Sequence, residues 1–144
     1  MAAKSAENLV NFPSPPTGTP GAAELDRSFA ARWKHPELFS RGYLVVPTLL
    51  LQHYAHLKPY PLSLGELVFV LHLMSYKWDA NAPYPGYKTL ARLMGVTDKM
   101  VRRHAQSLET KKYLKRVIRV GATNQFDLTP LFDALLKAVE SRRG

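Results

Sequence analysis

Apolar residues recur at helical spacing through most of the chain. In the first half, this spacing predicts a short helix over residues 24–39 and a second helix that begins near Pro47. Pro47 suits a first helical turn, where its missing N–H leaves no hydrogen bond unmade. The predicted stripes consist of Leu25, Phe29 and Trp33, and of Leu50, Tyr54 and Leu57. Residues 1–23 hold several prolines and few large apolar side chains, so we expect a flexible tail there and a folded domain over residues 24–144.

The most apolar run of the chain follows Ser63. Glu66 lies three residues beyond Ser63, at the spacing of a capping box, which predicts that a helix begins there. The run ELVFVLHLM is apolar almost all round, as expected of a helix that other elements surround. A buried parallel strand would also explain the run, but its length, the cap and the absence of alternating strands and helices favour a helix. Residues 79–86 are rich in proline and predict a loop.

The stretch LARLMGVTDKMVRR has the spacing of a helix-turn-helix. Ala91 is small enough for two helices to cross closely, Gly95 suits a turn with positive φ, and Val101 fits the second helix against the first. Thr97 is placed to cap the second helix. We therefore predict a helix-turn-helix over residues 87–111.

The second helix of this unit has two chemically different faces. At about 100° per residue, apolar residues share one face and polar residues share the opposite one. The apolar set is Val101, Ala105 and Leu108, and the polar set is Lys99, Arg102, Arg103 and Gln106. An ordinary solvated face is the alternative interpretation, but such faces usually mix charges of both signs and this set contains no acid. His104 flanks the apolar face, where we expect it to fix the helix or to meet a phosphate.

Two runs rich in β-forming residues follow and predict a basic hairpin, or wing, over residues 113–128. The runs cover residues 113–120 and 125–128 and flank a turn signal over residues 121–124. A hairpin directly after a helix-turn-helix is suited to grip a polyanion beside that helix. The side chains we expect to do so include Arg116, Arg119, Thr123 and Asn124.

The chain ends in a predicted helix over residues 129–141. Thr129 suits its cap and Pro130 its first position. Its apolar stripe consists of Leu131, Leu135 and Val139. The stripe either packs on the core of this chain, which we slightly prefer, or mediates self-association, which would match a two-fold binding site.

Composition narrows the range of functions. The chain has 144 residues, 46% of them apolar, which fits one compact domain. It has no cysteine, which excludes disulfides and thiolate metal sites. His53 and His56 lie three positions apart on a predicted helix, but no nearby carboxylate pair completes a metal site. We see no glycine-rich phosphate loop, nucleophile elbow or acidic pair, so we expect neither an enzyme nor a cofactor.

The positive charge of the chain is concentrated in one region. The formal net charge is +9, and residues 86–119 contain ten lysines and arginines against two acidic residues. Such focusing is typical of proteins with a polyanionic partner, although a solvated basic surface would have the same composition. No segment approaches the roughly 20 apolar residues of a membrane span, and the N-terminus lacks the layout of a secretory signal. We therefore expect a cytoplasmic, nucleoid-associated protein.

Together these motifs resemble bacterial winged helix-turn-helix domains. The resemblance covers residues 43–132 and rests on the VP pair at Val46, the capped helix at Ser63 and the runs TLARLMGV, VRRHAQSLE and YLKR. Such domains occur in small DNA-binding regulators and in plasmid and phage replication initiators, including DnaD-like primosome proteins. The resemblance implies a mainly α fold with a small β-hairpin wing.

Two positions depart from the usual pattern of these domains. Gly86 stands where serine commonly caps the first helix of the motif, and it gives up the side-chain hydrogen bond of the cap. Lys112 replaces the glycine that usually ends the second, recognition helix. Lys112 therefore has to adopt the left-handed conformation, at a cost of about 1 kcal/mol.

From the residues and the resemblance we expect sequence-specific binding to double-stranded DNA. The helix over residues 97–111 would enter the major groove, and the basic hairpin would meet the backbone or the minor groove. A transcriptional regulator is the simplest role, and a replication initiator or a protein-interaction adaptor are the alternatives. We expect no metal and no small-molecule ligand. The expected DNA contacts are Lys88, Thr97, Lys99, Arg102, Arg103, Gln106, Lys112, Lys115, Arg116, Arg119, Thr123 and Asn124.

Overall fold

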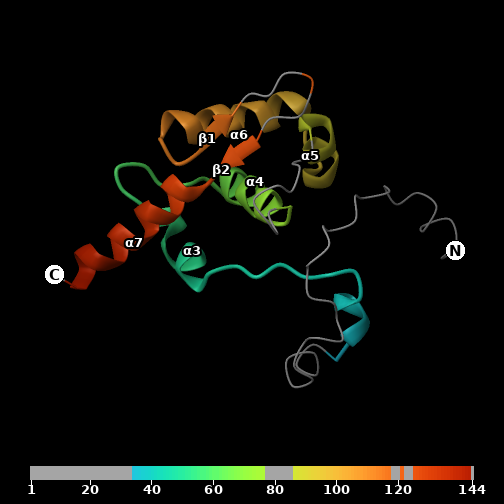
Figure 1. The fold of residues 1–144 in the computed structure, drawn as a ribbon, viewed down its shortest axis with the longest axis horizontal. Coiled ribbons are helices and arrows are strands. Elements are labelled where there is room, and N and C mark those ends of the chain that lie inside the picture. The colour runs from blue at the N-terminus through green and yellow to red at the C-terminus, as the bar shows by residue number, and fades with distance from the viewer. Residues whose placement is uncertain (1–33, 77–85, 118–120, 122–124, 144) are drawn as a thin grey trace, which may run out of the picture. The chain divides into compact units, whose positions relative to one another are not determined.

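The computed structural model of the protein describes residues 34–76, 86–117, 121 and 125–143 (Figure 1). Within these residues the fold is mainly helical, with five α-helices and one antiparallel hairpin that follows the helix-turn-helix, which confirms the predicted winged-helix class. The elements of the larger part are α3 (Thr48–His53), η3 (Tyr54–His56), α4 (Leu64–Met74), α5 (Tyr87–Met94), α6 (Asp98–Thr110), β1 (Lys115–Val117), β2 (Gln125–Asp127) and α7 (Thr129–Arg143).

The chain separates into two units, residues 1–43 and 44–144, and we describe each by itself. In the first unit, the described residues form a short 3-10 helix, η2 (Pro36–Phe39), and the rings of Phe39 and Tyr43 meet edge to face. The tail predicted over residues 1–23 and most of the helix predicted over residues 24–39 lie outside the described residues. The described end of that span is not α-helical: Lys34 and His35 have non-helical backbones, and Pro36, which lacks an N–H, begins a separate 3-10 helix instead of continuing an α-helix.

In the second unit, Pro47 lies just before α3 and not in its first turn. Pro47 has an extended backbone, with φ −61° and ψ 132°, and its carbonyl accepts the first helical hydrogen bond from the N–H of Leu50 at 3.0 Å. The helix then tightens into η3. Leu50 and Leu57 are buried and Tyr54 is partly buried, so the predicted stripe does pack into the core.

The capping box predicted for α4 is present. Ser63 Oγ accepts a hydrogen bond from the N–H of Glu66 at 3.1 Å, and Glu66 Oε1 accepts one from the N–H of Ser63 at 2.9 Å. The fully buried side chains of this helix are Phe69, Val70 and Leu73. The expectation that other elements surround α4 is wrong on one side, because Leu64 and Val68 are 70% and 40% exposed. The helices α5 and α6 pack against α4 and leave that side uncovered within the described residues.

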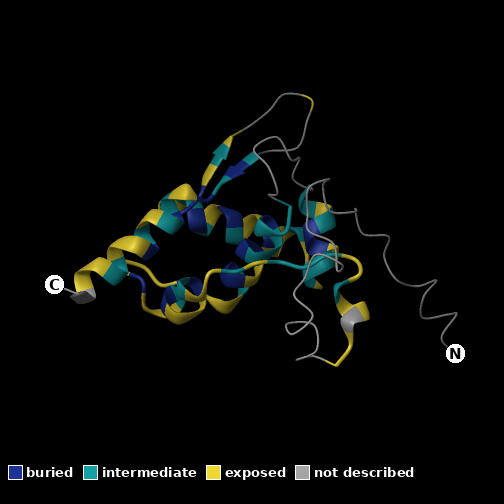
Figure 2. Cartoon of the chain, turned by 60° about the horizontal axis from the view of Figure 1, so that its bottom comes forward, coloured by how far each residue is buried: buried dark blue, intermediate teal, exposed yellow. Residues whose placement is uncertain are grey.

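Phe126 of the hairpin packs against the helices. Arg116 of β1 pairs with Phe126 of β2, and Phe126 is buried. Its ring meets that of Phe69 in α4 edge to face, with the centroids 6.1 Å apart. Figure 2 shows how the buried residues of the helices and of β2 face one another while the outer sides are exposed. The turn predicted over residues 121–124 is described only at Gly121, which has φ 73°.

The last helix, α7, begins at residue 129 as predicted and ends at Arg143, two residues beyond the predicted end. Thr129 lies inside α7 and does not precede it, and its N–H donates to Asp127 Oδ1 at 2.9 Å. An aspartate two residues ahead of such an N–H supplies the turn that starts the helix. Leu131 and Leu135 are buried in the common core, and α7 lies against α3 (Figure 1). This supports packing of the α7 stripe on the core of its own chain.

Candidate nucleic-acid interface

The turn between α5 and α6 has the geometry that its sequence predicts. Gly95 has φ 68° and ψ 34°, the left-handed conformation that a side chain disfavours. The N–H of Val96 donates to the carbonyl of Ala91 at 3.0 Å, and Ala91 is buried. Thr97 Oγ1 then accepts a hydrogen bond from the N–H of Met100 at 3.2 Å and caps α6. The direction in which α6 leaves the turn is therefore fixed by the backbone.

The helix α6 buries one face and presents the other to solvent. Its buried side chains are Val101, Ala105 and Leu108. Its exposed polar side chains include Lys99, Arg102, Arg103 and Gln106, which together with Asp98 line a shallow hollow of about 600 Å³. Within the described residues, the side chains of Lys99 and Arg103 make no hydrogen bond or ion pair. These cationic groups are therefore available to a ligand.

Four side chains, which we call the Tyr87 cluster, join α5, α6 and β1. The guanidinium of Arg102 lies over the ring of Tyr87, 5.6 Å from its centroid. Tyr87 Oη accepts a hydrogen bond from Arg116 Nη1 at 3.2 Å, and Arg116 Nε lies 3.0 Å from Glu109 Oε1. The hydrogen bond to Tyr87 raises the pKa of Arg116, so this side chain keeps its charge. The cluster links the recognition helix to the first strand of the wing.

This cluster changes the interpretation of Arg116. We expected Arg116 to grip the nucleic-acid backbone, but its side chain is 28% exposed and already has two partners inside the protein. Lys115, its neighbour on β1, is exposed and points to the other side of the hairpin because side chains alternate along a strand. Lys115 is therefore the better-placed cation of the described wing.

The crossing of α4 and α6 is unusually close at Gly65. A β-carbon at this position would lie 2.6 Å from Cε1 of His104, which is far inside van der Waals contact. Gly65 therefore makes room for the imidazole ring of His104 between the two helices. This contact agrees with the expectation that His104 fixes the recognition helix against the core.

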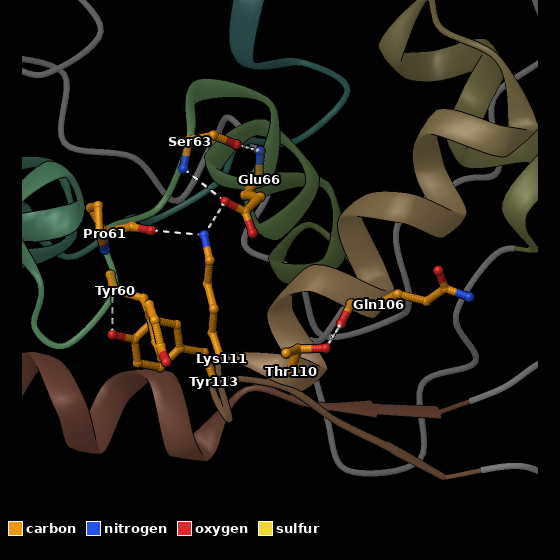
Figure 3. Close-up of polar contacts among 8 residues, drawn as sticks. All are labelled: Tyr60, Pro61, Ser63, Glu66, Gln106, Thr110, Lys111 and Tyr113. Atoms are coloured by element: carbon orange, nitrogen blue, oxygen red, sulfur yellow. Dashed lines mark hydrogen bonds and ion pairs between the residues drawn. The ribbon is translucent and has the colours of Figure 1, made fainter.

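An ion pair holds the C-terminal end of α6 (Figure 3). Lys111 Nζ donates to Glu66 Oε1 at 2.7 Å and to the carbonyl of Pro61 at 2.9 Å. The Glu66 side chain is only 4% exposed. Burial alone would raise the pKa of Glu66, but the hydrogen bonds from Lys111 and from the backbone of Ser63 outweigh it, so the pKa lies below its usual value. Glu66 thus caps α4 and anchors α6 with one carboxylate oxygen.

The residue after this anchor turns the chain into the wing. Lys112 has φ 64°, so the predicted left-handed conformation at this position is confirmed, and its side chain is exposed. Tyr113 is buried, and its hydroxyl donates to the carbonyl of Tyr60 at 2.6 Å. Figure 3 shows this bond beside the pair formed by Lys111. Lys111 and Tyr113, on either side of Lys112, are thus both tied to the loop before α4.

The other residues expected to contact DNA differ in how accessible their side chains are, and some of them lie outside the described residues. Lys88 at the start of α5 is exposed, whereas the hydroxyl of Thr97 is engaged in the α6 cap. Three expected wing residues lie outside the described residues: Arg119, Thr123 and Asn124. The sequence analysis did not identify Tyr87, whose ring lies beneath Arg102. Its position as an aromatic residue at the start of a predicted helix was the signal that could have pointed to it.

The two histidines considered as metal ligands differ in burial. His53 is buried and His56 is exposed. Among the described residues, no three histidine, cysteine or acidic side chains gather closely enough to hold a metal ion. No helix in the same part of the chain is long and apolar enough to cross a membrane.

Comparison with known proteins agrees with this geometry. Residues 60–114 match a family described as a helix-turn-helix domain. The match begins before the α4 cap and ends after Tyr113, so it contains α4, the turn at Gly95 and the whole of α6. No curated protein matches the chain.

Proposed function

We propose that this protein, whose residues 60–114 form a helix-turn-helix domain, binds double-stranded DNA and reads base sequence with α6. Binding to DNA is what a domain of this type suggests. Reading of bases is supported by one observation above all. The outward face of α6 carries four exposed hydrogen-bond donors and sits opposite a fully buried apolar face.

The residue types on this face suit base edges in the major groove. Arginine donates two hydrogen bonds to guanine, and glutamine pairs with adenine. We assign base contacts to Arg103 and Gln106, which lie three positions apart on the free face of α6. Arg102 is restrained by the Tyr87 ring, so it would meet the duplex with little loss of conformational freedom.

Phosphate contacts are proposed for exposed lysines around this face. Lys99 lies in the first turn of α6, Lys88 in the first turn of α5, and Lys112 and Lys115 flank the entry to the wing. Their charges are not neutralised by carboxylates within the described residues. They belong to the region that carries nearly all the excess positive charge of the chain. Contacts from the hairpin tip stay predictions.

The biological role that we propose is transcriptional regulation through the binding of α6 to a specific DNA site. A DNA-binding domain suits a regulator that occupies a promoter and either blocks RNA polymerase or recruits it. Footprinting over the promoter of the protein's own gene and over nearby sequence repeats tests this role. Protection of origin-type repeats in place of the promoter would favour a replication initiator.

The direct test selects bound duplexes from a random pool and then measures affinity over a salt series. Arg103→Ala should reduce the preference for the selected duplex over random duplex by about tenfold, because a bidentate base contact contributes about 1–3 kcal/mol of discrimination. Lys115→Ala should weaken both duplexes alike and lower the salt slope by about one phosphate contact. Lys137→Ala on α7 removes a similar charge away from α6 and is the matched control.

The two outcomes distinguish the parts of the proposal. Equal losses on both duplexes for Arg103→Ala would refute base reading while leaving DNA binding intact. Affinity for all duplexes no greater than that of an unrelated basic protein would refute DNA binding itself.

A further inference from the structure

A second concave surface lies away from the outward face of α6. It is an open groove of about 810 Å³ between the segment after α3 and the helix α7. None of the four exposed polar residues on the central face of α6 lines it. We call this surface the α7 groove. Its walls come from residues 53–59, 112–113 and 130–141, which all belong to the larger unit of the chain.

The α7 groove carries uncompensated positive charge. Lys58, Lys112 and Lys137 line it, against the single carboxylate of Asp133. Within the described residues none of these lysines is paired with a carboxylate, although Asp133 and Lys137 are spaced one helical turn apart. Lys111, by contrast, points away to the buried Glu66. The groove therefore favours an acidic ligand.

The lining of the groove also includes apolar residues, which bears on the kind of acidic ligand that it favours. Pro59, Tyr113, Ala134 and Ala138 line the groove together with the lysines. A DNA backbone offers only phosphates and sugars and would leave these apolar residues without a partner. A peptide that alternates acidic and apolar side chains would use both.

We propose that the α7 groove docks an acidic, partly apolar peptide segment of a partner protein. The lysines bind the carboxylates, and the small side chains of α7 admit the apolar residues. The proposal does not depend on DNA binding, since Lys58 and Lys137 take no part in the proposed DNA contacts. Lys112 is the one residue of the groove lining to which a phosphate contact is also assigned. A regulator or an initiator that holds DNA with α6 would keep this groove free to recruit a second protein.

The experiment uses the full-length protein and two pools of fluorescent peptides. One pool of peptides about ten residues long has glutamate at alternating positions and randomised apolar residues between them, and the second pool has glutamine in place of glutamate. We expect the glutamate pool to bind in low salt and the glutamine pool to bind at least about tenfold more weakly. Lys58→Glu and Lys137→Glu should each weaken the glutamate pool about threefold to tenfold, because each reverses an exposed charge.

Lys99→Glu on α6 is the matched control. This variant should weaken duplex binding and leave the peptide affinity within about twofold. The binding of a duplex is measured for every variant as well. The groove proposal is overturned when the glutamate pool does not bind, or when Lys99→Glu reduces peptide binding as much as Lys137→Glu does. Loss of duplex binding in Lys58→Glu and Lys137→Glu would show that the groove holds nucleic acid instead. The absence of duplex binding in the unaltered protein would refute only the proposed function.

Discussion

Replacing Lys111 with methionine tests how the recognition helix is held. Lys111→Met keeps a long, unbranched side chain and removes the ammonium group that lies 2.7 Å from Glu66 Oε1 and 2.9 Å from the Pro61 carbonyl. The carboxylate of Glu66 stays behind in a site where only 4% of the side chain is exposed. Its hydrogen bond from the N–H of Ser63 remains.

The expected cost follows from the burial of the two partners. Removing one member of a buried ion pair costs about 3–5 kcal/mol, because the other charge is left without compensation. The Lys111 side chain is 20% exposed, so water replaces part of the lost interaction and the lower end of this range applies. We expect Lys111→Met to lower the free energy of unfolding by about 3 kcal/mol, a large share of the 5–15 kcal/mol typical of a domain.

The pH dependence of the free energy of unfolding provides a second, independent test of the ion pair between Lys111 and Glu66. In the unaltered protein the pKa of Glu66 lies below its usual value of 4.5, so the folded state binds its proton less readily than the unfolded state. The stability that Glu66 contributes is therefore present above pH 4.5 and is lost as the pH falls through the folded pKa. Without Lys111, the pKa of Glu66 should rise relative to that in the unaltered protein, because burial is then opposed by fewer hydrogen bonds. The stability difference between the variant and the unaltered protein should therefore narrow as the pH falls toward 4.5.

Urea unfolding of the full chain at neutral pH and near pH 5 measures both effects. Lys112→Met is the control, because it removes the same charge one residue away at an exposed site, and it should change stability by less than about 0.5 kcal/mol. The double variant with Glu66→Gln should be more stable than Lys111→Met alone, since no buried charge remains. A loss below about 1 kcal/mol in Lys111→Met, with no relative recovery at low pH, would refute the role given to this pair.

Other contacts of the same region lead to shorter tests. Lys112→Gly should raise the free energy of unfolding by about 1 kcal/mol, measured by urea unfolding, because it relieves the left-handed backbone at φ 64°. Gly65→Ala should lower stability by about 1–2 kcal/mol by displacing the His104 ring, and adding His104→Ala should recover most of the loss. A stabilised Gly65→Ala protein, as helix propensity alone predicts, would contradict the close crossing. Tyr87→Phe should cost about 1 kcal/mol in thermal unfolding because Arg116 loses a hydrogen-bond acceptor, and no loss would contradict the link.

The features that the sequence predicts well depend on neighbouring residues. The capping box needs only Ser63 and Glu66, three positions apart, and the turn needs only a glycine at position 95. The left-handed conformation of Lys112 follows from the resemblance, because Lys112 stands where such domains usually end the recognition helix with glycine. Each of these constraints acts within a few residues, so local spacing and side-chain type suffice to predict it.

Contacts between distant segments could not be predicted in the same way. The pairing of Glu66 with Lys111 spans 45 positions, and that of Tyr87 with Arg116 spans 29. Both cations belong to a basic run in which the sequence distinguishes no lysine or arginine from the next. Only the packing of α4, α5 and α6 decides which of them face a carboxylate or a phenol. The expected phosphate contact of Arg116 therefore stays a prediction, and the structure shows that its guanidinium lies beside Tyr87 and Glu109.

The residues in and directly after α6 fall into two groups, and this affects how the effects of substitutions are interpreted. The long-range contacts that hold the helix fall on Arg102, His104 and Lys111, whereas Lys99 and Arg103 have none within the described residues. Substitutions in the first group shift the helix and change both stability and ligand affinity. Substitutions in the second group change affinity while unfolding stays constant. Measuring both stability and affinity for each variant therefore distinguishes residues that position the recognition helix from residues that contact the duplex. Arg102 is the exception, because it contacts Tyr87 and also lies on the face proposed to meet the duplex.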